Sequence, residues 1–147
     1  MAQEDKRTEK QLALAISATL SGTTASNGNV VDMDGFEAVT FCFATGTVTA
    51  AGTAGFTIKL QHSDTVVGTD FADVTLASDQ LGANLTVTSN DDDNVPVGMI
   101  GYVGNKRYVR CVATGTTNTN AVINGVAVKE CARYEPPVTV AANIAAT

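Results

Sequence analysis

Apolar and polar residues alternate in two well-defined runs of this 147-residue chain, at residues 38–45 and 56–61. In the first run Val39, Phe41 and Phe43 occupy every second position. A period of two is that of a β-strand with one face packed on a core. Because a stretch rich in Gly, Thr and Ala (residues 45–55) separates the two runs, they predict a β-hairpin.

Shorter apolar runs between turn-forming residues predict further strands. Residues 12–20 fit a helix or a strand, and a strand is favoured because a Gly- and Asn-rich turn follows. Pro96 predicts the start or the edge of a strand, since proline cannot donate to a sheet ladder. We expect the last strand to pair with the one before it. The further runs lie at residues 29–33, 71–76, 81–88, 95–103, 107–114 and 121–132.

These eight or nine short strands, without a convincing long helix, predict an all-β protein with mostly antiparallel pairing. The strand pattern leaves a jelly-roll and an immunoglobulin-like sandwich open. We expect one sandwich domain over residues 12–135. Residues 1–11 are charged and have no β pattern, so they predict an N-terminal arm. Pro136 and Pro137 stop the last strand, so residues 136–147 predict a C-terminal arm.

The composition narrows the classes of partner. Charged residues make up 16% of the chain, against roughly 25% in an ordinary soluble domain. The net charge of −6 argues against nucleic acid or an anionic membrane as the main partner, because both need clustered Lys and Arg. No secretory signal or membrane-spanning stretch is visible, so we expect synthesis in the cytoplasm, with Cys42, Cys111 and Cys131 as reduced, buried side chains.

The residues needed for catalysis are scarce. His62 is the sole histidine, and no Ser-His-Asp set, zinc-ligand spacing or phosphate-binding glycine loop occurs. The sequence therefore predicts a protein that is not an enzyme and has no cofactor. Asp91–Asp93 is the best candidate for binding calcium, but this run lacks the spaced order of an EF-hand loop. We expect it to be a solvated loop, and no metal site is predicted.

The basic residues are spread out, with one local cluster at Lys106, Arg107 and Arg110. Arg107, Tyr108 and Arg110 are the candidates for a surface that binds carbohydrate or nucleic acid. Such surfaces use exposed aromatic side chains, and this chain has three Tyr and no Trp. We therefore expect Arg110 to pair with an acidic residue, either within the sheet or across a contact between subunits.

Two segments carry a resemblance to a known group of proteins. One is Ile58–Asp64 (IKLQHSD), followed by Phe71–Val74, and the other is Ile100–Arg110 (IGYVGNKRYVR). Together they resemble capsid decoration (cement) proteins of tailed bacteriophages, over about Val30 to Arg133. The resemblance implies a jelly-roll sandwich on the outer surface of an assembled capsid. Its partners would be the major capsid protein and further copies of itself, as a dimer or trimer.

The arms and the basic cluster supply the residues that we expect to contact neighbouring subunits. A head–tail or tail component, and a carbohydrate-binding module assisted by calcium, are the alternative functions. The predicted contact residues are Glu4, Lys6, Arg7, Arg107, Arg110, Pro136, Pro137, Val138, Val140 and Ile144.

Overall fold

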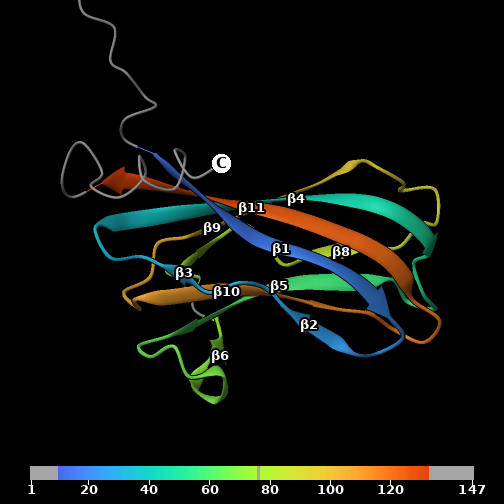
Figure 1. The fold of residues 1–147 in the computed structure, drawn as a ribbon, viewed down its shortest axis with the longest axis horizontal. Coiled ribbons are helices and arrows are strands. Elements are labelled where there is room, and N and C mark those ends of the chain that lie inside the picture. Colours follow the sequence, from blue (N-terminus) through green and yellow to red (C-terminus); the bar gives the residue numbers. More distant parts are fainter. Residues whose placement is uncertain (1–9, 76, 133–147) are drawn as a thin grey trace, which may run out of the picture.

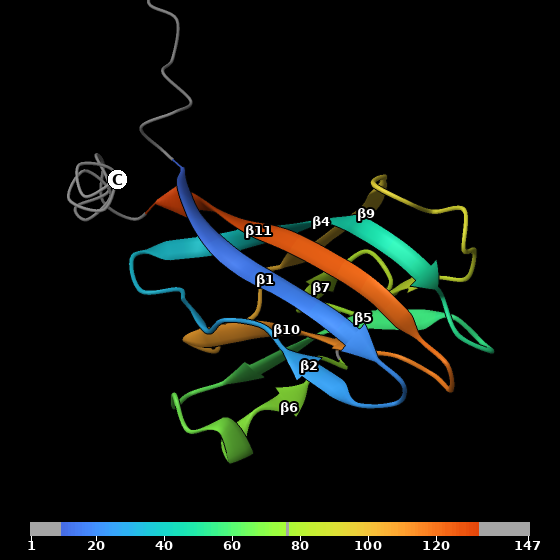
Figure 2. The ribbon, with the colours of Figure 1, turned by 45° about the vertical axis from the view of Figure 1, so that its right-hand side comes forward.

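Two facing antiparallel β-sheets form the part of the chain that the computed structural model describes, residues 10–75 and 77–132 (Figures 1 and 2). The predicted antiparallel sandwich is confirmed. Apart from Lys10 and Gln11, the two predicted arms lie outside the described residues. The elements are β1 (Gln11–Ser21), β2 (Ala25–Asn27), β3 (Val31–Asp32), β4 (Phe36–Ala50), β5 (Phe56–Ser63), the 3-10 turn η1 (Gly68–Asp70), β6 (Ala72–Asp73), β7 (Gln80–Leu81), β8 (Leu85–Val87), β9 (Pro96–Tyr102), β10 (Tyr108–Thr114) and β11 (Asn120–Ala132).

The strand order interleaves distant parts of the chain. Sheet A has the order β1-β11-β4-β9-β7, and sheet B has the order β2-β10-β5-β6, with β3 beside β10 and β8 beside β5. From β1 to β5, and again from β9 to β11, the chain passes back and forth between the two sheets. The first and the last described strands are therefore neighbours, and β11 lies between β1 and β4.

This order bears on the two sandwich types. In an immunoglobulin-like sandwich the first two strands belong to one sheet, whereas β1 and β2 lie in different sheets here. That alternative is therefore wrong. The jelly roll stays a prediction, and the interleaving is compatible with it. If β2 and β3 are counted as one strand, and β6 and β8 as another, the sandwich has eight main strands, with β7 as an extra edge strand of sheet A. In chain order, sheet A then holds strands 1, 8, 3 and 6, and sheet B holds strands 2, 7, 4 and 5.

Two predicted strand pairings are wrong. β4 and β5 do not form a hairpin, because β4 pairs with β9 and β11 in sheet A and β5 pairs with β10 in sheet B. The predicted loop was also too long, since β4 continues to Ala50. β11 likewise pairs with β1 and β4, not with β10. In both cases the loop crosses between sheets. Alternation identifies a buried face and says nothing about which strand lies beside it.

The alternating runs do form the core. Phe41 of β4 and Ile58 of β5 are fully buried, and so are Val109 and Cys111 of β10. Gly125 of β11 has a specific role here. A side chain at this position would collide with the ring of Phe43, which lies over the glycine from the neighbouring strand.

Some predicted strands are shorter than expected. Of residues 71–76 only Ala72 and Asp73 are strand among those described, and the run at 29–33 forms only Val31–Asp32. The run at 81–88 is divided into β7 and β8, which belong to different sheets. Gly82 lies between them with φ of +89°, a left-handed conformation that turns the chain from one sheet to the other. Pro96 is the first residue of β9, as predicted.

Candidate interaction surfaces

An apolar belt crosses the outer face of sheet A. Residues directly opposite one another on paired strands point to the same face, so the strand register defines two rows. One row is Leu14, Val126, Cys42 and Met99, and the other is Leu12, Val128, Thr40, Gly101 and Leu81. We refer to these nine residues as the apolar belt.

The belt is open to solvent. Leu12 is 69% exposed, Met99 65%, Leu81 58%, Leu14 54% and Val126 43%. In a sandwich the outward positions are normally polar, since only the inner faces reach the core. Large exposed apolar side chains on four of the five strands of one sheet are therefore unusual, and such patches mark surfaces that bind other molecules.

Polar pairs border the belt on both sides. On one side Ser17 Oγ donates to Asn124 Oδ1 over 3.0 Å, and on the other Lys10 Nζ lies 2.7 Å from Glu130 Oε1. The belt itself contains no charged residue, in a chain with a net charge of −6. An apolar centre with a polar rim is the usual anatomy of a protein–protein interface.

Sheet B has an outer face of a different kind. Arg110 donates to Gln61 Oε1 from Nε (3.0 Å) and Nη2 (2.8 Å), and its guanidinium lies 4.3 Å from the centre of the Phe71 ring. Gln61 Nε2 donates in turn to Asp73, which also pairs with Lys59 at 2.7 Å. The hydrogen bonds from Lys59 and Gln61 lower the pKa of Asp73.

The expectation for Arg110 is therefore partly wrong. Its hydrogen-bond partner on the neighbouring strand is an amide oxygen, not a carboxylate. Asp73 belongs to the same network through Gln61. Within the described residues the guanidinium is held inside one chain by Gln61, the Gly68 carbonyl and Phe71.

Arg107 lies elsewhere, at one end of the sandwich. Its Nε and Nη2 atoms donate to the two carboxylate oxygens of Asp32 at 3.0 and 2.9 Å, and Asp34 Oδ2 lies 3.6 Å from Nη2. This pairing lowers the pKa of Asp32 and raises that of Arg107. Arg107 and Arg110, three residues apart in the sequence, thus contribute to separate regions and do not form one basic patch.

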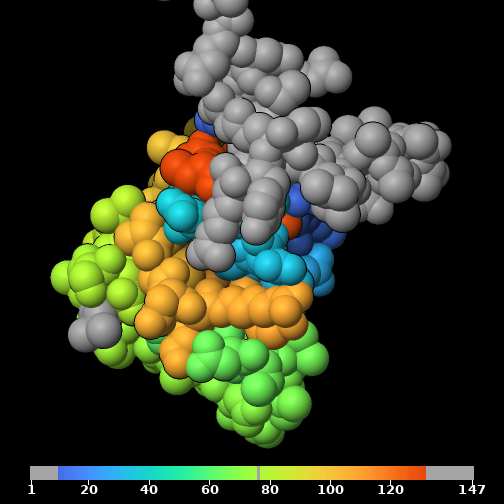
Figure 3. Space-filling view, turned by 90° about the vertical axis from the view of Figure 1, so that its left-hand side faces the viewer, coloured from blue at the N-terminus to red at the C-terminus, as the bar shows by residue number. Residues whose placement is uncertain are grey.

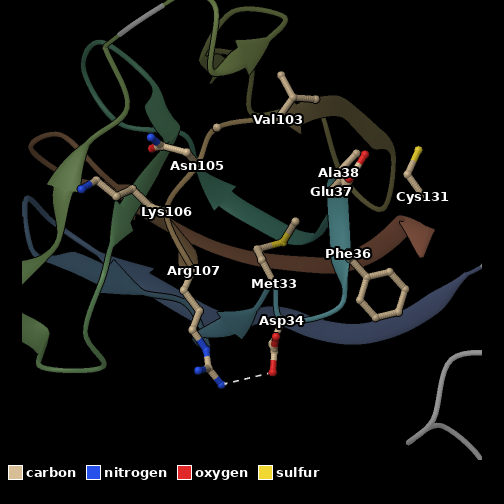
Figure 4. Close-up of a pocket in the computed structure, with 11 residues that line it drawn as sticks. Met33, Asp34, Phe36, Glu37, Ala38, Val103, Asn105, Lys106, Arg107 and Cys131 are labelled. Atoms are coloured by element: carbon tan, nitrogen blue, oxygen red, sulfur yellow. Dashed lines mark ion pairs between the residues drawn. The ribbon is translucent and has the colours of Figure 1, made fainter. Parts of the chain in front are cut away.

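A cavity of about 660 Å³ opens beside Arg107 (Figure 4). Its charged residues are already engaged: Arg107 faces Asp34, and Lys106 pairs with Asp64 of the β5–η1 segment. In Figure 3 the chain before β10 (orange) lies between the start of β4 (cyan) and this β5–η1 segment (green). The described lining residues are Met33, Asp34, Phe36, Glu37, Ala38, Val103, Gly104, Asn105, Lys106, Arg107 and Cys131.

The lining of the cavity is mixed, with apolar, polar and charged side chains. Its described lining residues include the apolar side chains of Met33, Phe36, Ala38 and Val103. Nearby, Lys129 is only 9% exposed; its Nζ donates to the Asp32 carbonyl at 3.1 Å and lies 4.7 Å from the Phe36 ring centre. Burial lowers the pKa of Lys129.

The other residues considered from the sequence have structural contacts. His62 Nδ1 lies 3.0 Å from the hydroxyl of the buried Tyr102, which accepts a hydrogen bond from the Lys106 N–H. In the acidic run, Asp93 accepts a hydrogen bond from the Val48 N–H. Within residues 10–75 and 77–132 no three His, Cys, Asp or Glu side chains converge on a possible metal position.

The three cysteines differ. Cys111 is fully buried, and burial raises the pKa of its thiol to about 12. Cys42 is half-buried, and desolvation raises its pKa as well. The prediction that Cys131 is buried is wrong. It is exposed near the end of β11 and has φ of +54°, so regular strand alternation, which would direct it to the core, does not hold there.

The contact residues predicted from the sequence lie in the two arms and at Arg107 and Arg110, and none of them belongs to the belt. Glu4, Lys6, Arg7, Pro136, Pro137, Val138, Val140 and Ile144 lie outside the described residues. A signal for the belt was present. Residues 12–20 are apolar with almost no alternation, and Val126 and Val128 flank the core residue Ala127. A strand that is apolar on both faces normally has both faces covered.

Comparison with known proteins reveals a likeness of fold. No protein-family model matches this sequence, and no curated protein matches it. Among solved structures, PBSX exported protein XepA aligns with 95% of this chain at a TM-score of 0.57 and 12% identity. This chain covers 43% of XepA.

Two further structures align less closely. SPBc2 prophage-derived protein YomS has a TM-score of 0.47 and 17% identity, over 81% of this chain and 92% of YomS. A chain from the disulfide-linked pili of Bacillus endospore appendages has a TM-score of 0.39 and 12% identity, over 84% of this chain and 87% of that one. At such identities the XepA likeness shows the fold alone. In the described residues η1 is the one helix, and its three residues are too few to cross a membrane.

Proposed function

We propose that this chain is a structural virion protein of a tailed phage. It binds the outside of the assembled capsid and stabilises the contacts between major capsid protein subunits. The apolar belt on sheet A carries the proposal: an open, uncharged apolar surface with a polar rim fits a protein partner better than a soluble substrate. The sequence resemblance to capsid decoration proteins supplies the identity of that partner.

The mechanism is mass action on the assembled state. A protein that binds assembled subunits better than free ones stabilises the shell by its binding free energy. Many copies on a symmetric lattice multiply a modest contact, so no single copy needs high affinity. A rigid sandwich suits this role, because a preformed sheet face loses little conformational entropy when it is covered.

The test places charge on the belt. Lysines introduced by Val126→Lys and Met99→Lys would be buried unpaired against a bound partner, so we expect occupancy on purified particles lacking the protein to fall by roughly tenfold or more. The matched control is Thr57→Lys with Asn27→Lys, which adds the same charge to exposed positions on the outer face of sheet B. Occupancy is measured by co-sedimentation with the particles.

The comparison of the two variants decides the result. Normal occupancy of the belt variant would overturn the assignment of the belt, and equal loss in both variants would show that net charge alone matters. Urea unfolding of each variant confirms that the domain still folds. Copy number on native particles separates a shell protein, present in many copies, from a head–tail or tail component, present in few.

A further inference from the structure

The four edges of the two sheets are unequally protected. Sheet A ends in the two-residue strand β7, and sheet B ends in the three-residue β2 and the two-residue β6. Very short edge strands, charges and prolines are common ways to prevent unwanted pairing. The fourth edge is β1, which has eleven residues and contains neither a charge nor a proline. Among the described residues β1 therefore provides the one long edge without a charge or a proline. A bulge at Ala15 and the Asn29 N–H, which donates to the Ala15 carbonyl at 2.7 Å, protect its middle, so its open part lies before Ala15.

Hydrogen bonds show which backbone groups of β1 face outward. The Gly22 N–H donates to the Thr119 carbonyl at 2.8 Å, which places residue 22 in a bonded pair with β11. Bonded pairs recur at every second residue of β1, and the bulge between Leu14 and Ile16 adds one extra residue to this count. The backbone N–H and C=O groups of Ala13 therefore point toward β11, and those of Leu12 point away from it. Leu14 agrees, because its carbonyl accepts from the Asn29 side chain at 3.1 Å, an acceptor role outside the β1–β11 ladder.

We propose that a second copy of this chain pairs with the β1 edge, antiparallel and about a two-fold axis at Ala13. In this register Leu12 of one copy lies opposite Leu14 of the other, and both residues direct their N–H groups to the open edge. The pair exchanges backbone hydrogen bonds, and Leu14 O has a second lone pair beside the one used by Asn29. Sheet A then continues from one copy into the next.

Three features favour a second copy over another strand. The segment is self-complementary, as an isologous two-fold contact requires. Leu12 and Leu14, two of the most exposed apolar side chains, meet their counterparts on the same face, which joins the two apolar belts into one surface. The segment is also uncharged, so two chains of net charge −6 approach where neither carries local charge.

Proline substitutions test the edge in the isolated protein. Leu12→Pro removes an N–H that faces outward and leaves the β1–β11 ladder intact, so the monomer should fold while self-association is lost. The matched control is Thr19→Pro. Thr19 also directs its N–H away from β11, but it lies outside the Leu12–Leu14 register. We expect the control to self-associate like the wild type in sedimentation-velocity measurements over a range of concentrations.

A disulfide trap tests the register. In a background with Cys42→Ser and Cys131→Ser, Ala13→Cys places two thiols at a directly opposed pair, about 4.5 Å apart at Cα and within the range of a disulfide. Oxidation should yield a covalent dimer for Ala13→Cys and none for Thr19→Cys. A wild-type chain that remains monomeric at every concentration overturns the proposal, and so does a dimer unaffected by Leu12→Pro.

The result is independent of the proposed function. Self-association is measured without particles, and Leu12→Pro leaves Val126 and Met99, the belt residues changed in the occupancy test, in place. If Leu12→Pro abolishes the dimer but still binds particles normally, the β1 contact stands and attachment does not require it. A dimer without any attachment to particles would refute the shell assignment and leave the β1 contact standing.

Discussion

The outer faces of the two sheets are built by opposite means. On sheet B, Lys59, Gln61, Asp73 and Arg110 form one connected set of hydrogen bonds and ion pairs. On the outer face of sheet A the belt positions hold mostly apolar side chains and no charged one, and the charged pair Lys10–Glu130 lies at the border. The same sandwich therefore has one face satisfied by its own side chains and one face with exposed apolar area that a partner would cover.

The difference between the two outer faces indicates which one can gain free energy by binding a partner. A polar network that is already satisfied gains little from a partner, because new hydrogen bonds replace existing ones. Burying apolar surface stabilises a complex by about 25 cal/mol for each Å² removed from water. The outer face of sheet B thus contributes to the stability of the domain itself, whereas the outer face of sheet A is available for association.

The largest expected effect on stability is on sheet B. Arg110→Ala removes the hydrogen bonds to Gln61 and the stacking on Phe71, so we expect a loss of about 1–3 kcal/mol in the free energy of unfolding. Leu14→Thr, on the exposed belt, should change it by no more than about 0.5 kcal/mol. Urea unfolding of both variants measures the contrast, and similar losses would remove the distinction between the faces.

Acid should weaken the domain through its paired carboxylates. The folded-state pKa values of Asp73 and Asp32 are lowered, so their contribution is present above the unfolded value of about 3.9 and disappears as the pH falls through the folded values. Asp73→Asn should flatten the decline in stability below about pH 4, by no more than about 1 kcal/mol because the Asp73 side chain is 44% exposed and solvent screens its ion pair.

Variants on the two outer faces should also differ in how their stability changes with acid. The belt has no carboxylate, so Leu14→Thr should keep the wild-type pH dependence. Thermal unfolding followed from neutral to acidic pH provides the comparison. An Asp73→Asn variant with an unchanged acid response would mean that other carboxylates control it.

The smallest expected effect is a change in thiol reactivity on the belt. Cys42 lies between Val126 and Met99, and its raised pKa makes alkylation slow at neutral pH and faster as the pH rises. A partner on the belt should protect Cys42 and leave the exposed Cys131 reactive. Cys111, with a pKa of about 12, should react only on unfolding. Mass spectrometry of alkylated peptides reads out all three, and labelling of Cys42 on attached protein would contradict coverage of the belt.

The sequence indicated more about the layers than about their connections. Alternation at Val39, Phe41 and Phe43 correctly identified the inner face of β4, because burial of one face is a local property of the strand. The partner of a strand depends on whether the following loop stays in one sheet or crosses to the other. Residues 51–55 cross, and no residue type in that loop encodes the choice.

The candidate surface was missed for a related reason. Leu12 and Leu14 were seen as apolar, but each strand contributes only one or two residues to the belt. Their alignment into rows depends on the register of β11 against β1 and β4, which contains three register shifts in all. A surface that exists only through pairing between strands far apart in the sequence is invisible in any local pattern.

The adjacency of β1 and β11 also has a mechanical consequence. Gln11 lies opposite Lys129, so both ends of the described chain leave the sandwich from the same corner. A pull applied between these ends would open the β1–β11 ladder one hydrogen bond at a time, which resists little force. A load entering through the outer face of sheet A would instead be shared across five strands. A shell under pressure would therefore be better restrained through that face than through the two ends of the chain.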